Sequence, residues 1–462
     1  AVPAIATPPA AIAGVFRWGP VGETVLVSSE NELVNRFGEP NNDNYETFFV
    51  AADYLSYSNA LYVARVDNGA VIASASDTSN ANSALHTFGS FDALYPGDLG
   101  NSLEVAYVQS TQFENDVIAV ADVSASRLTG NTQIGQTLAF NASSIVFEVL
   151  PSAALAATTF EAGDIVEVGN ESVGYQDISV ATFAEKTLDS AGTETANTSL
   201  IASHEYTIAL DSSYKLAEDD LNKLSLTRKW KYHNSFGRAP QTGNYHVLVK
   251  DEDGVITGEA GTILELYEDV SKTSSATLPD GSTNYYQQVI TNKSSWVKVA
   301  NTAHFESSSQ YSTYESLASG TSGTSESATS LAAKAAGYDL FKASNEIDVS
   351  FILQGKGDNS GNLANYIISN ISDYRKDCVA FLSPSKEAVV DENKTNAKLT
   401  KTIAYRNTLQ NSSYWFMDSG YKYRYDKYND FYRWVPLNGD TAGLASRVEP
   451  FESPAGFRKG VI

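Results

Sequence analysis

EIDVSFILQGKGDNSGNLANYIISNISDYRKDCVAFLSP, residues 346–384, is the stretch that decides the fold. The apolar run EIDVSFILQG (346–355) predicts a buried strand, and NLANYIISNISDYR (362–375) predicts a helix. DCVAFLSP (377–384) predicts the next strand. Strand, helix and strand in this order are typical of a parallel sheet with helices on its faces. Residues 326–462 are therefore expected to form a doubly wound α/β domain.

The N-terminal part of the chain repeats this alternation of strands and helices. AIAGVFRWGPVGETVLVSS (11–29) predicts two short strands about a Gly-Pro turn. Ser29 is a good N-cap for the helix that follows, and Glu32 completes a capping box. A second helix is expected over 45–56 and a buried strand over 60–66. These elements also favour an α/β architecture.

The pattern changes between about residues 111 and 230. Short alternating runs replace helical periodicity there, as in VIAVADV, SIVFEVL and YTIAL. Such runs predict an inserted antiparallel β-barrel or sandwich-like domain. The expected division is an extended proline-rich arm at 1–11, a discontinuous middle α/β domain at 12–110 plus 231–325, the β-rich insertion at 111–230 and the α/β domain at 326–462. The Ser/Thr/Gly-rich stretch 320–330 is the best linker candidate.

Charge and composition exclude several classes of function. The 462 residues carry a formal net charge of −23, so a direct nucleic-acid partner is not expected. From Ile371 onward 14 Lys and Arg face 11 Asp and Glu, a net +3, which leaves −26 for residues 1–370. This asymmetry suits complementary contacts between subunits, but the charge taken alone favours an ordinary solvated acidic surface. No apolar stretch reaches the length of a membrane span, and the single cysteine, Cys378, is expected in the core.

No motif in the chain marks an active site. The five histidines lack metal-ligand spacing, so a metal site between His233 and His246 is improbable. QGKGDNSGN (354–362) follows a strand but lacks the spacing of a phosphate-binding loop, which favours a glycine-rich turn. No GxSxG supports a serine nucleophile. The chain is therefore expected to be no enzyme and to bind no cofactor or metal.

The segment YKYRYDKYNDFYRW (421–434) combines tyrosines with lysines and arginines. Stacking on single-stranded nucleic acid would use such residues, but the acidity of the chain opposes that reading. Tyrosine and arginine are also the residues that dominate contacts between proteins. The segment is therefore interpreted as a contact surface.

The ordered set of blocks in this chain resembles the contractile tail sheath proteins of myovirus-type bacteriophages. YKYRYDKYNDFYRWVPLNGDTAGLASRVE and ESPAGFRKGVI (both within 421–462) carry the closest similarity. AIAGVFRWGPVGE, NELVNRFGEP, LYVARV, YPGDLGNSLEV, SFGRAPQTGNYHVLV and ISDYRKDCVAFLSPSKEAVV add to it in the family's order. Together these blocks cover roughly half of the chain.

The resemblance implies a structural subunit of the virion tail that has no catalytic activity. It implies stacked six-fold rings around a tail tube, assembled in the host cytoplasm, that contract to drive the tube through the host envelope for genome ejection. The implied partners are the protein itself, the tail tube protein, and the baseplate and tail terminator proteins, without membrane insertion. Inner α/β domains would face the tube and inserted β-domains would project outward. The alternatives are the sheath of a phage-like secretion or bacteriocin particle, or a β-rich adhesin or carbohydrate-binding surface protein.

Two departures from the family pattern lead to further expectations. Similar sheath proteins carry a projecting domain before the YPGDLG block, whereas this chain places its insertion after that block, at 111–230. The family's C-terminal domain, which pairs with extended arms of neighbours, is expected to be absent from this chain. Seven cations are expected to lie partly on a surface that faces the tube or a neighbouring subunit, with salt bridges inside the domain as the alternative. They are Lys422, Arg424, Lys427, Arg433, Arg447, Arg458 and Lys459.

Overall fold

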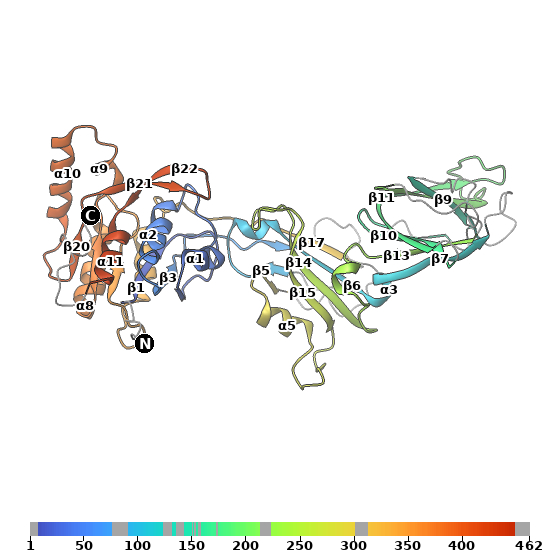
Figure 1. Ribbon diagram of the computed structural model, residues 1–462, viewed down its shortest axis with the longest axis horizontal. Coiled ribbons are helices and arrows are strands. Elements are labelled where there is room, and N and C mark those ends of the chain that lie inside the picture. The colour runs from blue at the N-terminus through green and yellow to red at the C-terminus, as the bar shows by residue number, and fades with distance from the viewer. Residues whose placement is uncertain are drawn as a thin grey trace.

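The computed structural model describes residues 8–75, 91–122, 132–134, 143–149, 151, 154–155, 159–171, 174–212, 223–300 and 313–448. The molecule is elongated, and three sheets follow one another along its longest axis (Figure 1). An α/β body occupies one end, an antiparallel sheet the middle, and a second antiparallel sheet the far end. The fold is thus mixed α/β with several sheets, as the alternating and helical patterns predicted.

The α/β body is built on a six-stranded mixed sheet. Its strands, in spatial order, are β2 (Thr24–Val27), β3 (Leu61–Arg65), β1 (Ala10–Gly14), β18 (Phe351–Leu353), β19 (Val379–Leu382) and β20 (Trp415–Met417). Neighbouring strands are parallel except at the edge, where β2 runs antiparallel to β3. Parallel pairs require crossover connections, and helices supply most of them. The strands predicted at 60–66, 346–355 and 377–384 therefore belong to one sheet.

Helices cover both faces of this sheet. One face carries α1 (Glu30–Phe37), α2 (Tyr45–Leu55) and α11 (Asn438–Ser446); the other carries α6 (Leu331–Asp339), α7 (Asn362–Ile367) with its π-helical continuation η4 (Ile368–Ser372), α8 (Asp373–Arg375) and α10 (Thr395–Thr408). The short helix α9 (Lys386–Val389) precedes α10. In β1, Ile12 packs with Phe48 on the first face and Ala11 packs with Ile367 on the second. Burial on both sides explains why these strands read as continuous apolar runs.

Helix α1 begins where the sequence predicted. Ser29 Oγ accepts a hydrogen bond from the Glu32 backbone N–H at 3.2 Å. Glu32 Oε2 accepts in return from the Ser28 backbone N–H at 2.9 Å, one residue before the position that a standard capping box uses. The helix ends at Gly38, whose φ of 77° is a conformation that glycine adopts without strain. The capping interaction is thus confirmed, with a shift of one residue in its second bond.

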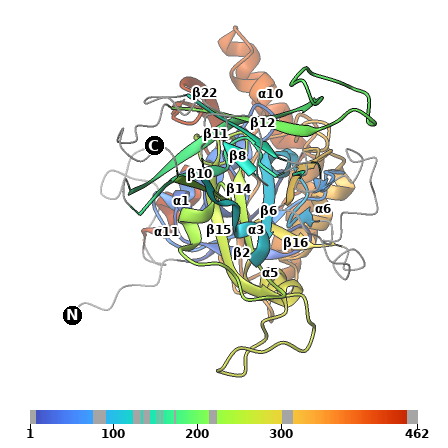
Figure 2. The ribbon, with the colours of Figure 1, turned by 90° about the vertical axis from the view of Figure 1, so that its right-hand side faces the viewer.

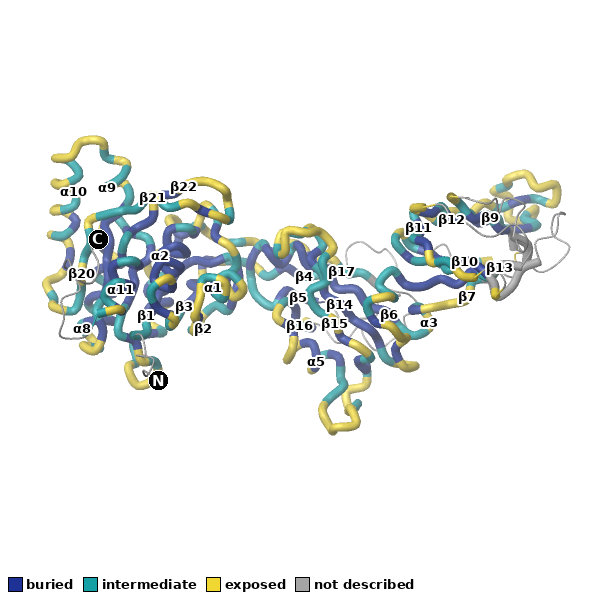
Figure 3. The backbone as a smooth tube through the Cα atoms, viewed as in Figure 1, coloured by how far each residue is buried: buried dark blue, intermediate teal, exposed yellow. Residues whose placement is uncertain are grey.

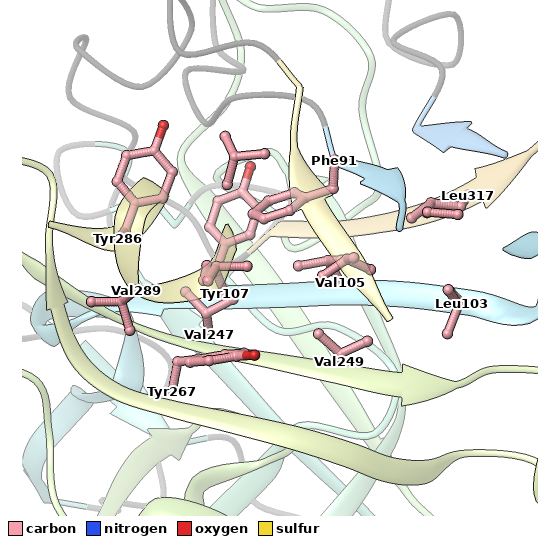
Figure 4. Close-up of a cluster of buried hydrophobic side chains, with 14 of the residues drawn as sticks. Phe91, Leu103, Val105, Tyr107, Val247, Val249, Tyr267, Tyr286, Val289 and Leu317 are labelled. Atoms are coloured by element: carbon pink, nitrogen blue, oxygen red, sulfur yellow. The ribbon is translucent and has the colours of Figure 1, made fainter. Parts of the chain in front are cut away.

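The middle sheet has seven antiparallel strands. In spatial order they are β15 (Thr262–Ser271), β14 (Asn244–Asp251), β6 (Leu103–Gln109), β17 (Thr313–Ala318), β4 (Ser74–Ala75), β5 (Phe91–Ala93) and β16 (Val297–Val299). Helix α5 (Tyr286–Lys293) and the 3-10 turn η1 (Asp98–Ser102) flank it. Alternate residues of its central strands, such as Val105, Tyr107 and Val247, meet the side chains of α5 in one buried cluster (Figure 4). One face of this sheet therefore forms the core of the region.

The far sheet also has seven antiparallel strands and curls into a half-barrel. Its strands are β7 (Glu114–Asp122), β13 (Lys223–Lys229), β10 (Ile165–Asn170), β11 (Gly174–Leu188), β12 (Ser203–Leu210), β9 (Ser144–Val149) and β8 (Thr132–Ile134). Phe147, Val168 and Ile208 lie in the hydrophobic cluster of this sheet. The prediction of an antiparallel β-rich insertion is confirmed. Because β7 and β8 end the order of the sheet, the observed form is an open half-barrel.

The three regions are nested in the sequence. The chain leaves the α/β body after β3, enters the middle sheet, and passes through α3 (Ser110–Phe113) into the far sheet. It returns through α4 (His233–Phe236) and re-enters the body before α6. Strand pairing thus places β1 and β3 in one sheet with β18–β20. It also joins 103–109 to 244–251. The predicted division instead grouped all of 12–110 with 231–325. The division into domains itself stays a prediction.

The predicted linker 320–330 runs beside the outgoing strand of the chain. Thr321 and Val71 exchange two backbone hydrogen bonds of 3.0 and 3.1 Å. The Asn68 side chain donates to the carbonyls of Ser322 and Thr324, both at 2.7 Å. The segment does connect the middle sheet to the α/β body, but it is held by a paired neighbour along part of its length. Composition predicted the connection and could not show the pairing.

Candidate subunit interface

The tyrosine-rich segment forms a two-stranded hairpin on the α/β body. Its strands are β21 (Tyr421–Asp426) and β22 (Phe431–Pro436), which pair antiparallel. Figure 3 shows the hairpin over α2 at the surface of the body, with an exposed tip. Successive side chains of a strand point to opposite faces, so the alternation in YKYRYD separates tyrosines from cations. The hairpin therefore has an aromatic face and a charged face.

The aromatic face points outward. Tyr423, Tyr425, Tyr432 and Trp434 are 58, 45, 55 and 37% exposed. Tyr423 lies opposite Trp434 and Tyr425 opposite Tyr432 in the ladder, with ring centroids 5.0 and 5.2 Å apart. Tyr423 also stacks on Tyr432 at 5.1 Å. We call these four residues the aromatic ladder.

The charged face points inward, toward α1, α2 and α11. Lys422 Nζ lies 2.8 Å from a carboxylate oxygen of Asp53 and 2.8 Å from one of Asp440. Arg424 pairs with Asp53 as well, and its guanidinium lies 3.5 Å from Glu30. Burial, together with the charge of Asp440, raises the pKa of Asp53 to about 6, while the two cations oppose this rise. Lys422 and Arg424 thus hold the buried Asp53 in place, and Lys422 also holds the partly buried Asp440.

Two more of the predicted cations also have partners in the chain. Arg433 is buried and its Nε donates to Asp426 Oδ2 at 2.6 Å, with its guanidinium 4.1 Å from the Phe431 ring centroid. Lys427 lies 3.4 Å from a Glu30 oxygen, and its side chain is 54% exposed.

The remaining predicted cations lie near or beyond the end of the described chain. Arg447 is exposed and donates to the backbone carbonyls of Ser56 and Tyr57, at 3.1 and 3.3 Å. Arg458 and Lys459 lie outside the described residues. The five described cations therefore all have intrachain contacts, and their role at an interface stays a prediction. The sequence did contain a signal for the outward tyrosines. In YKYRYD every second residue is a tyrosine, which in a strand places the tyrosines on one face and the cations on the other.

Helix α11 fixes the base of the hairpin against α2. A Cβ on Gly439 would lie 2.3 Å from the Val50 carbonyl oxygen, so only glycine allows this approach of the two helices. Asn438, which is fully buried, donates to the Gly355 carbonyl and to Ser383 Oγ, both at 2.9 Å. These bonds tie α11 to the carboxyl ends of β18 and β19. The hairpin therefore stands on a rigid support.

The carboxyl ends of the parallel strands hold two acids, the buried Glu326 and the partly buried Asp418. Ser383 Oγ donates to Asp418 Oδ2 at 2.6 Å, and burial raises the pKa of Asp418 to about 7. Thr47 Oγ1 donates to Glu326, whose pKa burial likewise raises to about 7. Ligands often bind at this edge of α/β sheets. Here the glycine-rich turn fills it, since a Cβ on Gly357 would lie 2.3 Å from the Pro384 carbonyl oxygen.

The candidate catalytic and metal residues have structural roles. His246 Nδ1 accepts from the Asp269 backbone N–H at 3.0 Å and its other ring nitrogen lies 2.7 Å from the Arg238 carbonyl, so it is a neutral core histidine. Cys378 is buried, as predicted, and burial raises the pKa of its thiol to about 12. The described residues contain no cluster of His, Cys, Asp and Glu that could hold a metal. None of the helices in the described part of the chain combines the length and apolar composition that a membrane crossing requires.

Comparison with known proteins identifies the chain. Residues 9–66, which contain β1 to β3, match the family described as "Tail sheath protein Gp18 domain III N-terminal region". The tail sheath proteins of Salmonella phage ViI and Vibrio phage KVP40 are 27 and 26% identical and cover 97 and 99% of this chain. That of Enterobacteria phage T4 is 26% identical over 98% of it. The chain belongs to the tail sheath proteins of myovirus phages. It is a non-enzymatic structural subunit of a contractile tail sheath in the virion.

The extent of these matches bears on the alternatives left open by the sequence. The chain spans 69, 73 and 72% of the three phage sheath proteins. Because nearly the whole chain aligns, the β-rich insertion lies within a sheath protein and gives no support to an adhesin.

Solved sheath structures show a looser likeness. The sheath tail protein of Desulfitobacterium hafniense has a TM-score of 0.38 at 9% identity, with 95% of this chain and 59% of that chain covered. The one from Listeria innocua has a TM-score of 0.37 at 9% identity, with 87 and 57% covered. The assignment to the sheath family therefore rests on the sequence relatives.

Proposed function

We propose that this subunit polymerises as stacked hexameric rings around a tail tube, and that contraction of the sheath drives the tube through the host envelope for genome ejection. The observation that carries this proposal is the similarity of 97–99% of the chain to the sheath proteins of three phages. The tail tube protein, the baseplate and the tail terminator are its partners, and assembly takes place in the host cytoplasm.

In this proposal the α/β body is the inner, tube-facing part, with a doubly wound sheet, and the half-barrel projects outward. The elongated shape supports this arrangement, because the body and the half-barrel lie at opposite ends of the longest axis (Figure 1). When one end faces the tube, the other must lie at a larger radius. The view along that axis shows the half-barrel strands in front of the body (Figure 2). The domain boundaries predicted from the sequence belong to the same proposal.

The cations of the hairpin region are proposed as part of the inner contact surface. Lys427 and Arg447 are the exposed members of the described set and can reach a partner without rearrangement. Lys422, Arg424 and Arg433 are engaged with carboxylates of their own chain, so they would have to exchange these partners to bind a neighbour. Arg458 and Lys459 remain part of the proposal. Energy stored in a metastable assembly, rather than a nucleotide, would drive such a change.

Electron microscopy of the purified complete protein tests the proposal. We expect long hollow tubes with six-fold symmetry when viewed end-on, and sheathed tubes when the tail tube protein and baseplate are supplied. Only monomers or amorphous aggregates, under conditions in which related phage sheaths polymerise, would contradict it.

A further inference from the structure

The aromatic ladder is an exposed apolar surface whose underside is already occupied. Its four side chains bury about 150–250 Å² each when fully covered, so at roughly half exposure they offer about 400 Å² of aromatic surface. The largest exposed apolar patch on a monomeric protein is typically about 300–600 Å² and is often functional. The inward residues contact the body beneath: Arg424 pairs with Asp53, and the Arg433 guanidinium lies 4.5 Å from the Tyr45 ring centroid. The inward contacts hold the hairpin on the body, and the aromatic face is left exposed to solvent.

We propose that the aromatic ladder is the centre of a contact with a second copy of this chain. This inference rests on the proposed sheath function and names one partner for the hairpin. It assigns the binding to the outward aromatic rings, whereas the charge-based prediction placed it on lysines and arginines. Stacked tyrosines and a tryptophan lose little side-chain entropy on binding, which makes them effective anchors.

Charge complementarity favours a second copy as the occupant. The hairpin, residues 421–436, carries four cations and two carboxylates, while residues 1–370 of the same chain have a net charge of −26. Lys422, Arg424 and Arg433 are paired with carboxylates of their own chain, so Lys427 is the exposed cation that the hairpin presents to the acidic residues of a neighbour. Lys427, at the hairpin turn, is exposed at the rim of the ladder. The phenol groups of Tyr423 and Tyr432 can donate hydrogen bonds to carboxylates of the neighbour.

The size of the patch also fits contact within a polymer. A stable two-partner interface buries about 800 Å² on each side, and the ladder supplies about half of this. By itself it would give a weak association. In a repeating assembly each subunit touches several neighbours, so a patch of this size contributes the well-packed centre of one of several contacts.

Site-specific photo-crosslinking tests this contact in assembled sheath. A benzophenone amino acid replaces Tyr423 or, separately, Tyr432 in the complete protein, and sheath particles are irradiated. We expect covalent dimers of the sheath protein whose cross-linked peptides come from residues 1–370 of another copy. Tyr374 is the matched control position, because it is 65% exposed and lies outside the ladder, near Lys342. It should give at least ten-fold fewer such dimers.

The outcomes separate this inference from the proposed function. Cross-links from the ladder positions to the tail tube or to any other protein would overturn it and leave the sheath function intact. Normal sheath with no ladder cross-links would do the same. A native protein that forms no sheath under any assembly condition would overturn both.

A substitution gives a second, independent measurement. Replacement of Tyr423 and Tyr432 together by serine should raise the critical concentration for sheath assembly at least ten-fold. The thermal unfolding of the unassembled chain should stay unchanged, because both rings face solvent there. Tyr374→Ser should change neither quantity. Equal critical concentrations for the double variant and the native chain would overturn the proposal.

Discussion

Two buried carboxyl groups, Asp164 of the half-barrel and Glu326 of the α/β body, are held in opposite ways. In the half-barrel Asp164 is fully buried, and it accepts from Arg228 Nε at 2.8 Å and from two backbone N–H groups, of Glu161 and Lys231. In the body Glu326 is also buried but accepts from a neutral residue, Thr47, and its Oε2 has no hydrogen-bond partner among the described residues. The first acid is held by a cation and by amides, the second by a neutral residue. The two regions should therefore respond differently to pH.

The carboxyl ends of the parallel strands extend this contrast. Burial raises the pKa of both Glu326 and Asp418 to about 7, and neither has a cation within ion-pair distance among the described residues. Asp251 in the middle sheet is different again, because Ser102, Ile256 and Thr257 donate to it and these bonds hold its pKa below the usual value. Proton uptake near neutral pH is thus expected at Glu326 and Asp418 of the α/β body and not at Asp251.

The largest change in stability is expected when the buried ion pair of the half-barrel is removed. Asp164→Ala removes the carboxylate of a buried pair and leaves the guanidinium of Arg228 buried without its charged partner, with the Gln112 oxygens among its acceptors. Loss of one partner of a buried ion pair costs about 3–5 kcal/mol. Chemical denaturation of the unassembled chain at pH 7, followed by its tryptophan fluorescence, should show this loss.

A matched control separates burial from charge. Asp177 also pairs with a lysine, Lys229, at 2.9 Å, but its side chain is 40% exposed. Asp177→Ala should cost no more than about 1 kcal/mol, since exposed pairs are screened by water. Similar losses for the two substitutions would show that the half-barrel does not depend on the buried pair.

The next effect is opposite in sign and belongs to the α/β body. Glu326 has a folded pKa of about 7, whereas an unfolded glutamate titrates near 4.3. Between about pH 4 and 7 the folded chain therefore binds more protons than the unfolded chain, so stability falls as pH rises through this window. Glu326→Gln mimics the protonated acid and should stabilise the chain by about 1–3 kcal/mol at pH 8.

The pH dependence distinguishes this cause from ordinary repacking. At pH 4 both the acid and the amide are neutral, so the native chain and Glu326→Gln should have the same free energy of unfolding. Denaturation curves at pH 4 and pH 8 measure both values. A stabilisation of equal size at the two pH values would indicate a packing effect and would contradict a role for the ionisation of Glu326.

Much of the fold could be predicted because local patterns decide it. The apolar runs at 60–66 and 377–384 predicted buried strands, and the alternation in 111–230 predicted an antiparallel insertion. The pairing of β1 with β18 joins residues some 340 positions apart, and no local signal in either strand specifies it. Nor could composition show that 320–330 pairs with the outgoing chain. Long-range pairing depends on which apolar faces meet, and that is a property of the folded whole.

The sequence could predict where the candidate contact surface lies, but not which of its side chains face outward. The tyrosines and cations of 421–434 marked a contact surface. Their roles depend on the acids beneath the hairpin, Asp53 of α2 and Asp440 of α11, which lie far apart in the sequence. Because these acids attract Lys422 and Arg424 inward, the aromatic rings are left on the outside.

The smallest of these effects tests that inward attraction. Lys422→Met removes the cation that lies between Asp53 and Asp440 and keeps most of the side chain's apolar stem. The two carboxylates then repel each other, and because the native Lys422 side chain is partly exposed we expect a loss of only about 1 kcal/mol at pH 8. Asp53 already has a pKa raised to about 6, and removal of Lys422 raises it further. At pH 5 Asp53 is therefore protonated in the variant, the repulsion disappears, and the loss in stability should fall toward zero.

Lys427→Met is the control, because Lys427 is 54% exposed and contacts only Glu30 among carboxylates of the described residues, so its removal should cost a few tenths of a kcal/mol. Equal losses for Lys422→Met at pH 5 and pH 8 would mean that the lysine acts through packing, and the charged face of the hairpin would then not be what orients the aromatic ladder outward.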